Sequence, residues 1–492
     1  MGLISANKVC FNDVFFQYPK NEKYALEGVN LSIEEGDFLA VMGENGAGKT
    51  TFCKLINGII PHLTVGKLRG SVTVDGLNTK DVTVPQLALK TGIVLDDPEV
   101  QLFTSTVRHE AAFGPENLCL PKDEIEKRIG FALNAVGLAQ KGFENRQLST
   151  LSGGEKQRLS IAAALAMKSK ILVLDEPLSR LDPQGARDVL NTLKEINEKF
   201  HITIIIASGN TSLMAEYAGK VCILKNGKII AHDEAKNIFS NNPFLEENGI
   251  EPCYLNNNPY SLFIENCSML STPSSVINIS NFSYSYQNGI DIENINFSIN
   301  ENDFTALIGD NGCGKTTLLK NISGLLKPSK GDIFIYGKNT KKLSVSEISR
   351  EIGFVMQNPQ NQLFSDTVFD EIAFALKNMR LSKSEIKRRA EEALEITDLK
   401  DASAFPHSMS RADQTKTILA CVIAMGVKII LLDEADIGND YKGNLKIMST
   451  LKKLQSKGYT IIFVTHNMFL TSFADRLIKM ERKGIVFDGR AN

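Results

Sequence analysis

Short apolar runs alternate with amphipathic stretches along the whole chain of 492 residues. Runs such as DFLAVM (37–42) and KILVLD (170–175) are typical of buried strands, because they are short, apolar and closed by polar or glycine residues. The stretch KDEIEKRIGFALNAVGL (122–138) places apolar residues at helical spacing and predicts a helix. This alternation favours an α/β fold with a mainly parallel sheet.

The pattern occurs twice in the same order. GENGAGKTT (43–51) returns as GDNGCGKTT (309–317), and TIIIASGN (203–210) returns as TIIFVTHN (460–467). The order and spacing of the intervening segments are shared, so the chain contains one large domain in duplicate rather than a series of short repeats.

The stretch between the two copies is rich in asparagine, proline and serine and has no sustained period. We therefore predict a first domain at 1–240, a linker at 241–275 with a short helix at its start, and a second domain at 276–492.

Charge and composition narrow the function. The net charge of −2 gives no electrostatic support for nucleic-acid binding. The eight cysteines are scattered without metal-ligand spacing and fit reduced thiols. We find no signal-peptide pattern, and the longest apolar run, ILACVIAMGV (418–427), is half of the roughly 20 residues that span a membrane. Any membrane role is therefore expected to depend on a partner.

Both repeated glycine-rich loops follow an apolar run and precede a helical pattern, which is the context of a phosphate-binding P-loop. Their backbone N–H groups can surround phosphates, and Lys49 and Lys315 can reach the β- and γ-phosphates of ATP. Thr50 and Thr316 are candidate Mg²⁺ ligands. The candidate nucleotide-binding residues of the loops are Gly43, Asn45, Gly46, Gly48, Lys49, Thr50 and Thr51, and Gly309, Asn311, Gly312, Gly314, Lys315, Thr316 and Thr317.

An apolar run in each copy ends in an acidic pair, Asp175-Glu176 and Asp433-Glu434. Behind a P-loop, the aspartate is a candidate Mg²⁺ ligand and the glutamate a candidate base for the water that attacks ATP. Without the P-loop, the same pair is more often the start of a helix.

LSGGEKQR (151–158) precedes ILVLDEP (171–177), about 105 residues after a P-loop, and this combination resembles the ATP-binding subunit of ABC transporters. The resemblance covers nearly the whole chain apart from the linker. It implies two P-loop ATPase domains, each with a helical and an antiparallel β subdomain, that close head to tail around two ATP molecules. Each site then takes its signature serine and glycines from the opposite domain.

A narrower resemblance rests on DDPEVQLFTSTVRHEAAFGPENLCLP (96–121) and its second version NPQNQLFSDTVFDEIAFAL (358–376). These segments are similar to the ATPases of energy-coupling-factor importers for vitamins and metal ions, in which two ATPases are also found fused. The likeness implies a peripheral protein at the cytoplasmic face of the cell membrane. Its implied partners are a transmembrane coupling protein and a substrate-binding membrane protein.

The family's motifs are unequally kept in the two copies. The second copy has the glutamine-loop residue Gln357, also a candidate metal ligand, and the switch histidine His466, where the first has Asp96 and Gly209. The first signature is Ser152, Gly153 and Gly154, whereas the second is Ser410, Arg411 and Ala412. The loop SRLD (179–182) of the first copy, with Asp182, is IGND (437–440) in the second.

Under head-to-tail pairing, all the altered motifs fall on one site. The second P-loop with Glu434 and the first signature form a complete site, and the first P-loop with Glu176 and the second signature form a degenerate one. A long side chain in place of a signature glycine blocks close approach of backbone N–H groups to the γ-phosphate. We therefore predict one hydrolytic site and one impaired site, at which Glu176 is retained and Arg411 could still add a compensating charge.

Three further residues have candidate roles. Tyr18 and Tyr286 precede the P-loop of each copy, and the resemblance implies that they stack on adenine; a packing role is the alternative. Cys313 lies inside the second P-loop, so its alkylation is expected to block activity with protection by ATP, unless it is a buried inert thiol.

Two other functions compete with an importer ATPase. A soluble twin ATPase acting on ribosomes would also lack membrane segments, but two intact signatures and a long charged helical linker are expected there. A non-hydrolytic regulatory module conflicts with the complete set of motifs at the second P-loop.

Overall fold

The apolar runs of the sequence form buried strands at the centre of each half of the chain. All five residues are buried in β3 (Phe38–Met42), β7 (Ile171–Asp175) and β8 (Thr203–Ala207). Alternate residues of β3 enter different cores: Ala40 and Met42 pack in one cluster, and Leu39 and Val41 in another. Both faces of this sheet are therefore covered, which explains its continuous apolar runs.

The computed structural model describes residues 7–19, 21–179, 181–253, 263–265, 275–285, 291–481 and 484–491. The chain divides into two compact units, Met1–Leu255 and Asn256–Asn492.

The first unit has a six-stranded and a four-stranded sheet. The larger sheet has the order β10-β9-β3-β8-β7-β6, with β10 antiparallel and the other strands parallel. The antiparallel sheet has the order β2-β1-β4-β5. The remaining strands are β1 (Asn7–Gln17), β2 (Leu26–Glu34), β4 (Lys67–Val74), β5 (Leu77–Asn78), β6 (Thr91–Val94), β9 (Lys220–Lys225) and β10 (Lys228–Glu234).

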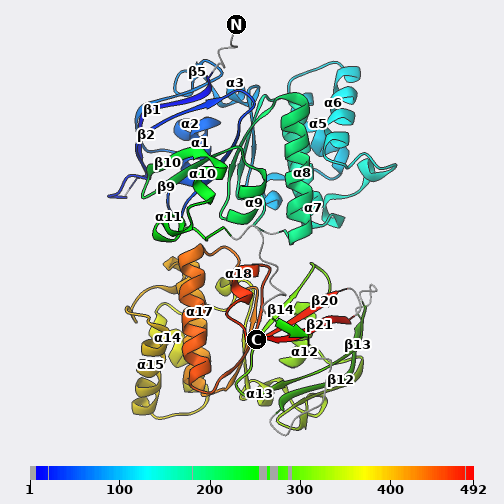
Figure 1. Ribbon diagram of the computed structural model, residues 1–492, viewed down its shortest axis with the longest axis vertical. Helices are drawn as coiled ribbons and strands as arrows, with labels where there is room; N and C mark the ends of the chain where they lie inside the picture. The colour runs from blue at the N-terminus through cyan, green and yellow to red at the C-terminus, as the bar shows by residue number, and fades with distance from the viewer. Residues whose placement is uncertain are drawn as a thin grey trace. The chain divides into compact units, whose positions relative to one another are not determined.

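Helices of the first unit cover the larger sheet and build a helical subdomain on the side away from β1 and β2 (Figure 1). Helix α6 confirms the helix predicted at 122–138. The helices are α1 (Lys49–Ile56), α2 (Ile59–His62), α3 (Val84–Ala88), α4 (Pro98–Gln101), α5 (Val107–Asn117), α6 (Lys122–Ala135), α7 (Gly153–Ala166), α8 (Pro183–Phe200), α9 (Thr211–Tyr217), α10 (Ala235–Phe239) and α11 (Asn242–Glu247), with 3₁₀ turns at Phe143–Asn145 and Leu148–Thr150.

The second unit repeats this plan. Its sheets have the orders β11-β21-β20-β14-β19-β18-β17 and β13-β12-β15-β16. The strands are β11 (Phe263–Glu265), β12 (Ser275–Ser285), β13 (Asp291–Asn300), β14 (Phe304–Gly309), β15 (Lys330–Ile335), β16 (Lys338–Asn339), β17 (Ile352–Val355), β18 (Ile429–Asp433), β19 (Thr460–Val464), β20 (Arg476–Glu481) and β21 (Gly484–Ala491). The helices are α12 (Lys315–Ile322), α13 (Val345–Ile348), α14 (Val368–Asn378), α15 (Lys383–Thr397), α16 (Arg411–Met425), α17 (Tyr441–Ser456) and α18 (Met468–Thr471), with 3₁₀ turns at Thr340–Lys342, Pro359–Asn361 and Pro406–Ser408.

The predicted α/β class is confirmed, with a mainly parallel sheet, an antiparallel β subdomain and a helical subdomain in each unit. The helix predicted at the start of the linker is α11. Leu245, Ile250 and Cys253 are buried in the core of the first unit, so the opening part of the predicted linker 241–275 packs on that unit. Most of its remainder lies outside the described residues.

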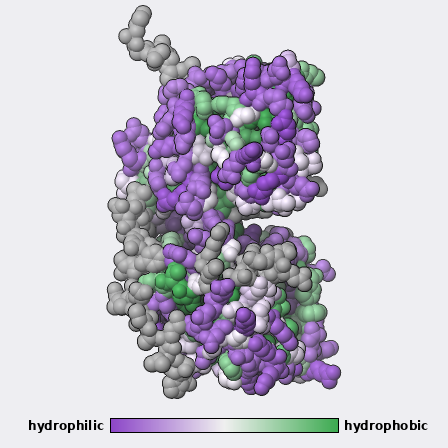
Figure 2. All heavy atoms as spheres, turned by 90° about the vertical axis from the view of Figure 1, so that its right-hand side faces the viewer, coloured by the Kyte–Doolittle hydropathy of each residue, from purple (hydrophilic) through white to green (hydrophobic). Residues whose placement is uncertain are grey.

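Among the described residues, no helix has both the length and the apolar character needed to cross a membrane. Described residues on the face drawn in Figure 2 are mostly hydrophilic, and the hydrophobic ones gather in smaller areas.

Candidate nucleotide-binding sites

A P-loop joins β3 to α1 in the first unit and β14 to α12 in the second. Gly43 and Gly309 have φ values of 152° and 151°, and a Cβ on either would lie 2.2 Å from a backbone oxygen, of Leu224 or Met480. Only glycine fits there, which brings the loop close to the neighbouring strand and leaves its tip open. At that tip, Asn45, Gly46, Asn311 and Gly312 are exposed.

The two P-loop lysines are buried at the base of their loops. Lys49 Nζ donates to the carbonyl of Gly43 at 2.8 Å, and Lys315 Nζ donates to the carbonyl of Gly309 at 2.7 Å. The side chain therefore folds back under the loop, where its ammonium group can reach phosphates held by the backbone N–H groups. The glycines Gly48 and Gly314 cap the following helices with φ near 110° and 105°.

Each acidic pair lies at the carboxyl end of a buried strand, β7 in the first unit and β18 in the second. One strand, β8 or β19, lies between it and the strand that leads into the P-loop. Thr316 Oγ1 donates to Asp433 Oδ1 at 3.0 Å, and the hydroxyl of Thr50 bonds Asp175 in the first unit. Burial raises the pKa of Asp433 to about 6, and burial and the charge of Asp96 raise the pKa of Asp175. These carboxylates are costly to bury without a cation.

The residues fit Mg²⁺. A hydroxyl and a carboxylate oxygen are adjacent in each unit, and Mg²⁺ prefers oxygen ligands and retained waters. In the first unit, Asp175 Oδ1 is buried without a hydrogen-bond partner among the described residues. A cation and its water would satisfy that atom.

The two glutamates have different surroundings. Glu434 accepts a hydrogen bond from Gln357 Nε2 at 2.7 Å and contacts His466 Nε2 at 3.0 Å. Glu176 instead accepts from the backbone N–H of Gly209 at 3.2 Å and lies 3.5 Å from Lys49 Nζ. The replacement of the glutamine and the histidine in the first copy thus changes which groups contact the candidate base.

The pKa values of the glutamates move in opposite directions. Burial raises the pKa of Glu176 above its ordinary value, and the charge of Lys49 only partly opposes this. Burial acts on Glu434 too, but the hydrogen bond and charge of His466, with Lys315 and Gln357, lower its pKa below the ordinary value. Glu434 is therefore ionised at neutral pH, as a general base must be.

Replacing His466 with alanine is expected to lower kcat at pH 7 by about tenfold or more. It is also expected to move the acidic limb of the kcat–pH profile to higher pH. Without the histidine, burial would raise the pKa of Glu434. As the pH falls, this carboxylate would then become protonated at a higher pH than in the unchanged chain. The measurement is ATPase activity between pH 5 and 8. His407→Ala, at an exposed histidine of the same unit, is the control; an unmoved limb in His466→Ala would contradict the assignment.

The signature segments open helices α7 and α16. Ser152 and Gly153 are exposed, and the Ser152 side chain accepts from the N–H of Glu155 at 3.3 Å. Ser410 caps α16 in the same way by accepting from Asp413. The capping serine is thus kept in both units, and the difference lies in the next two residues: an added Cβ at Gly153 meets nothing within 4 Å, and one at Gly154 meets only Leu181 at 3.9 Å.

Of the two candidate tyrosines, the structure describes only Tyr18. Tyr18 is partly buried, and its hydroxyl lies 3.0 Å from Thr51 Oγ1 on the P-loop helix. Its ring packs edge-on against Phe16, which fits the alternative packing role, and stacking on adenine stays a prediction. Tyr286 lies outside the described residues. Thr317, like Thr51, lies in the first turn of its helix.

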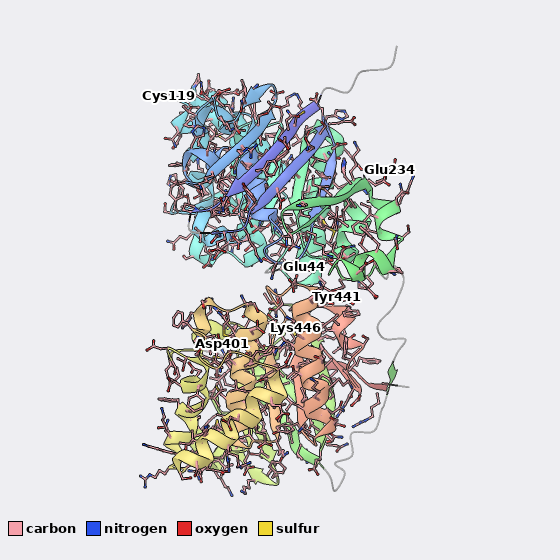
Figure 3. All side chains as sticks on the ribbon, turned by 90° about the vertical axis from the view of Figure 1, so that its left-hand side faces the viewer. Glu44, Cys119, Glu234, Asp401, Tyr441 and Lys446 are labelled. Carbon is pink, nitrogen blue, oxygen red and sulfur yellow. The ribbon has the colours of Figure 1, made fainter. Side chains whose placement is uncertain are left out.

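Cys313 is a buried thiol, with 4% of its surface exposed. Burial raises its pKa, which reduces the reactive thiolate. This favours the inert thiol over the alkylation target. We expect brief alkylation without ATP to modify Cys119, which is exposed and lies at the surface of the first unit (Figure 3), before Cys313. Peptide mass spectrometry measures the order; rapid modification of Cys313 would show that its loop opens.

Sequence reasoning missed two buried glutamates that shape the segments after the glutamine loops. Glu110 Oε2 accepts from the N–H groups of Phe103 and the next residue at 3.2 and 3.0 Å. Glu371 Oε2 does the same for Phe364 and the next residue at 2.9 and 2.7 Å. The signal was present, because QLFTSTVRHE and QLFSDTVFDE keep the phenylalanine and glutamate at one spacing.

Two similar proteins match nearly the whole chain, and a family model matches part of each unit. The ABC transporter family matches residues 26–179 and 292–436. A "Putative ABC transporter ATP-binding protein" of Caldanaerobacter subterraneus subsp. tengcongensis is 34% identical over 98% of this chain and 91% of its own. A protein of the same name from Methanosarcina mazei is 33% identical over 98% of this chain and 89% of its own.

A solved structure from Clostridium perfringens, described as cbiO1 of the ABC transporter complex cbiONQ, is 31% identical. It covers 49% of this chain and 94% of its own, with a TM-score of 0.44. The family match includes residues of both units. Each unit has a P-loop that begins at a position where only glycine fits, together with an acidic pair. The chain therefore belongs to the ABC transporter family, as an ATP-binding and ATP-hydrolysing protein with two ATPase domains.

Proposed function

We propose that the chain is the motor subunit of an ABC-type importer, with one complete and one degenerate ATP site. The observation that carries the proposal is the pair of contacts to Glu434 from Gln357 and His466, which Glu176 lacks. The P-loop of Lys315 belongs to the complete site, together with Ser152 and the signature glycines of the first unit. The P-loop of Lys49 belongs to the degenerate site.

In the complete site, the backbone of the second P-loop and Lys315 hold the β- and γ-phosphates. Thr316, Gln357 and Asp433 would hold Mg²⁺, which draws charge from the phosphates and orients them for displacement. Glu434 accepts the proton of the attacking water, and its lowered pKa keeps it ionised for that step. His466 contacts Glu434, which supports a role for its imidazole at the γ-phosphate and that water.

In the degenerate site, Glu176 accepts from the backbone N–H of Gly209 and lacks the two contacts by which Gln357 and His466 orient Glu434, so this base is less well oriented for an attacking water. Asp96 adds negative charge beside Asp175, where the second unit has a neutral amide. This site holds nucleotide with slow turnover or none.

An exposed aromatic pair beside each glutamine loop supports a membrane partner. Phe103 and Phe113 pack at 4.6 Å between ring centroids, and Phe364 and Phe374 at 4.7 Å. Phe103 and Phe364 are 64% and 61% exposed although buried glutamates fix their backbones. Rigid, exposed aromatic side chains are typical of interaction sites. Cytoplasmic helices of a transmembrane coupling protein are the partner that we assign to them.

The importer class rests on the two segments at 96–121 and 358–376, which resemble energy-coupling-factor ATPases. We accordingly propose uptake of a vitamin or metal ion, with the chain bound at the cytoplasmic face of the cell membrane. A substrate-binding membrane protein completes the assembly, and the cargo is selected by the membrane subunits.

Affinity purification from detergent-solubilised membranes tests this function. The tagged chain is expected to bring down integral membrane proteins, and Phe103→Asp with Phe364→Asp is expected to lose them while keeping ATP binding. Phe200→Asp is the matched control, because Phe200 is also an exposed phenylalanine, at 44%, but lies at the end of α8. Recovery of ribosomes instead of membrane proteins, unaffected by the two substitutions, would favour the soluble translation factor.

A further inference from the structure

The second signature contains a side chain that contacts the catalytic apparatus of its own unit. Arg411, the first residue of α16, donates from Nη2 to the backbone carbonyl of Gln357 at 2.9 Å. The side chain of Gln357 donates in turn to Glu434 Oε2 at 2.7 Å. One residue thus separates the guanidinium group from the candidate base.

Arg411 also lies against the loop that follows Glu434. Gly438 has a φ of 79°, and a Cβ built on it would lie 3.1 Å from Arg411 Cδ and 3.2 Å from Nη1. The N–H of Ile437 bonds the carbonyl of Glu434 at 3.2 Å, which ties this loop to the same residue. The arginine is therefore held between the glutamine loop on one side and the loop after Glu434 on the other.

The first unit connects the same elements differently. Gly153 occupies the position of Arg411 and has no side chain to reach the glutamine loop. Lys156, one turn further along α7, pairs instead with Glu99 on α4. The Glu99 side chain is 65% exposed, so this ion pair is largely solvated and contributes little. The carbonyl contact of Arg411 is thus a feature of the unit that keeps Gln357 and His466.

We propose that Arg411 is a positioning residue for ATP hydrolysis in the second unit. It fixes the backbone of Gln357 and thereby keeps the amide of Gln357 on Glu434. Arg411 then has two effects. It damages the signature that faces the first P-loop, and it supports Glu434, the base of the complete site. This inference rests on the proposed function, in which Glu434 carries the turnover.

The test uses the purified full chain carrying Glu176→Gln, so that turnover comes from Glu434 alone, and this chain is the reference. Adding Arg411→Ala is expected to lower kcat about tenfold, the effect of losing one hydrogen bond to a charged group of about 1.5 kcal/mol, with KM for ATP changed less than about twofold. Arg411→Lys, which keeps a donor, is expected to restore at least a third of the reference kcat. Arg350→Ala, at an exposed arginine of the same unit, controls for the loss of charge.

A double-substitution cycle separates positioning from a general structural role. In a chain that already carries Gln357→Ala, Arg411→Ala is expected to lower kcat by less than twofold, since its effect passes through the missing amide. An equal loss with and without Gln357 would overturn the proposal, and so would an increase in kcat. Turnover restored to Glu434→Gln by Arg411→Gly would also overturn it, because the arginine would then act on the first P-loop site.

A different result would reject the proposed function itself. If Glu434→Gln alone keeps its turnover, Glu434 is not the base, whatever Arg411 does. Melting temperatures of all variants within a few degrees of the reference show that the changes in kcat do not come from unfolding.

Discussion

Glu434→Gln is expected to lower the ATPase kcat by about 10²- to 10⁴-fold, the range of a lost general base, whereas Glu176→Gln keeps more than half of the wild-type rate. The two substitutions are chemically identical and lie at equivalent ends of β7 and β18. Their different outcomes follow from the surroundings of each carboxylate. Glu434 is oriented by Gln357 and His466, whereas Glu176 accepts from the backbone N–H of Gly209.

Glutamine keeps the size of glutamate but cannot take a proton, so folding and nucleotide binding are retained in both variants. The measurements are steady-state phosphate release and equilibrium binding of ATP by each purified chain. Binding in the Glu434→Gln variant is the internal control, because a loss there would reflect damage to the site rather than to the base. Equal losses of kcat in the two variants, or a larger loss in Glu176→Gln, would reject the assignment of the complete site.

The sequence was sufficient for the fold and for the parts of the site with short-range signals. Gly43 and Gly309 restrict the backbone locally, so the glycine pattern alone predicts a P-loop. That Gln357 and His466 belong with Glu434 was implied by the family resemblance, and the structure brings them together because parallel strands β17, β18 and β19 end at one edge of the sheet. The roles of these residues in hydrolysis stay predictions until the variants are measured.

The features that the sequence did not predict depend on where a side chain points after folding. For Arg411 the sequence indicates an obstacle in a signature or a compensating charge for the γ-phosphate, since no pattern indicates that its guanidinium reaches the carbonyl of Gln357. Glu110 was missed because a glutamate is ordinarily solvated, and its shared spacing from a phenylalanine in both copies does not by itself show that it is buried on two backbone N–H groups. The start of the predicted linker shows the same effect, because Leu245 packs into the core of the first unit and no sequence pattern indicates that contact.

The signature of the first unit provides the second large effect. Gly153→Arg with Gly154→Ala copies the second signature into the first unit, and we expect kcat to fall by about 10²- to 10³-fold although Glu434 is unchanged. Under head-to-tail pairing, these glycines let backbone N–H groups approach the γ-phosphate held by Lys315. Removing a preorganised donor at a developing charge has an effect of this size.

The local structure can accept both substitutions. Neither glycine has a positive φ, and the added Cβ atoms meet no atom closer than 3.9 Å. The capping contact between Ser152 and Glu155 does not use the altered side chains. A fall in kcat without a fall in melting temperature would therefore reflect the ATP site. Gly130→Arg is the matched control, because Gly130 is exposed on α6 with nothing within 4 Å of an added Cβ.

The result decides between two pairings of the motifs. If the doubly substituted chain hydrolyses ATP at the wild-type rate, the first signature does not serve the site of Lys315, and composite pairing fails even if Glu434 proves to be the base. If kcat falls as expected, the glycines of one unit and the base of the other act on one ATP molecule. The unequal loss of motifs between the two copies is then one loss at a single site, because all the altered motifs surround the ATP molecule held by Lys49.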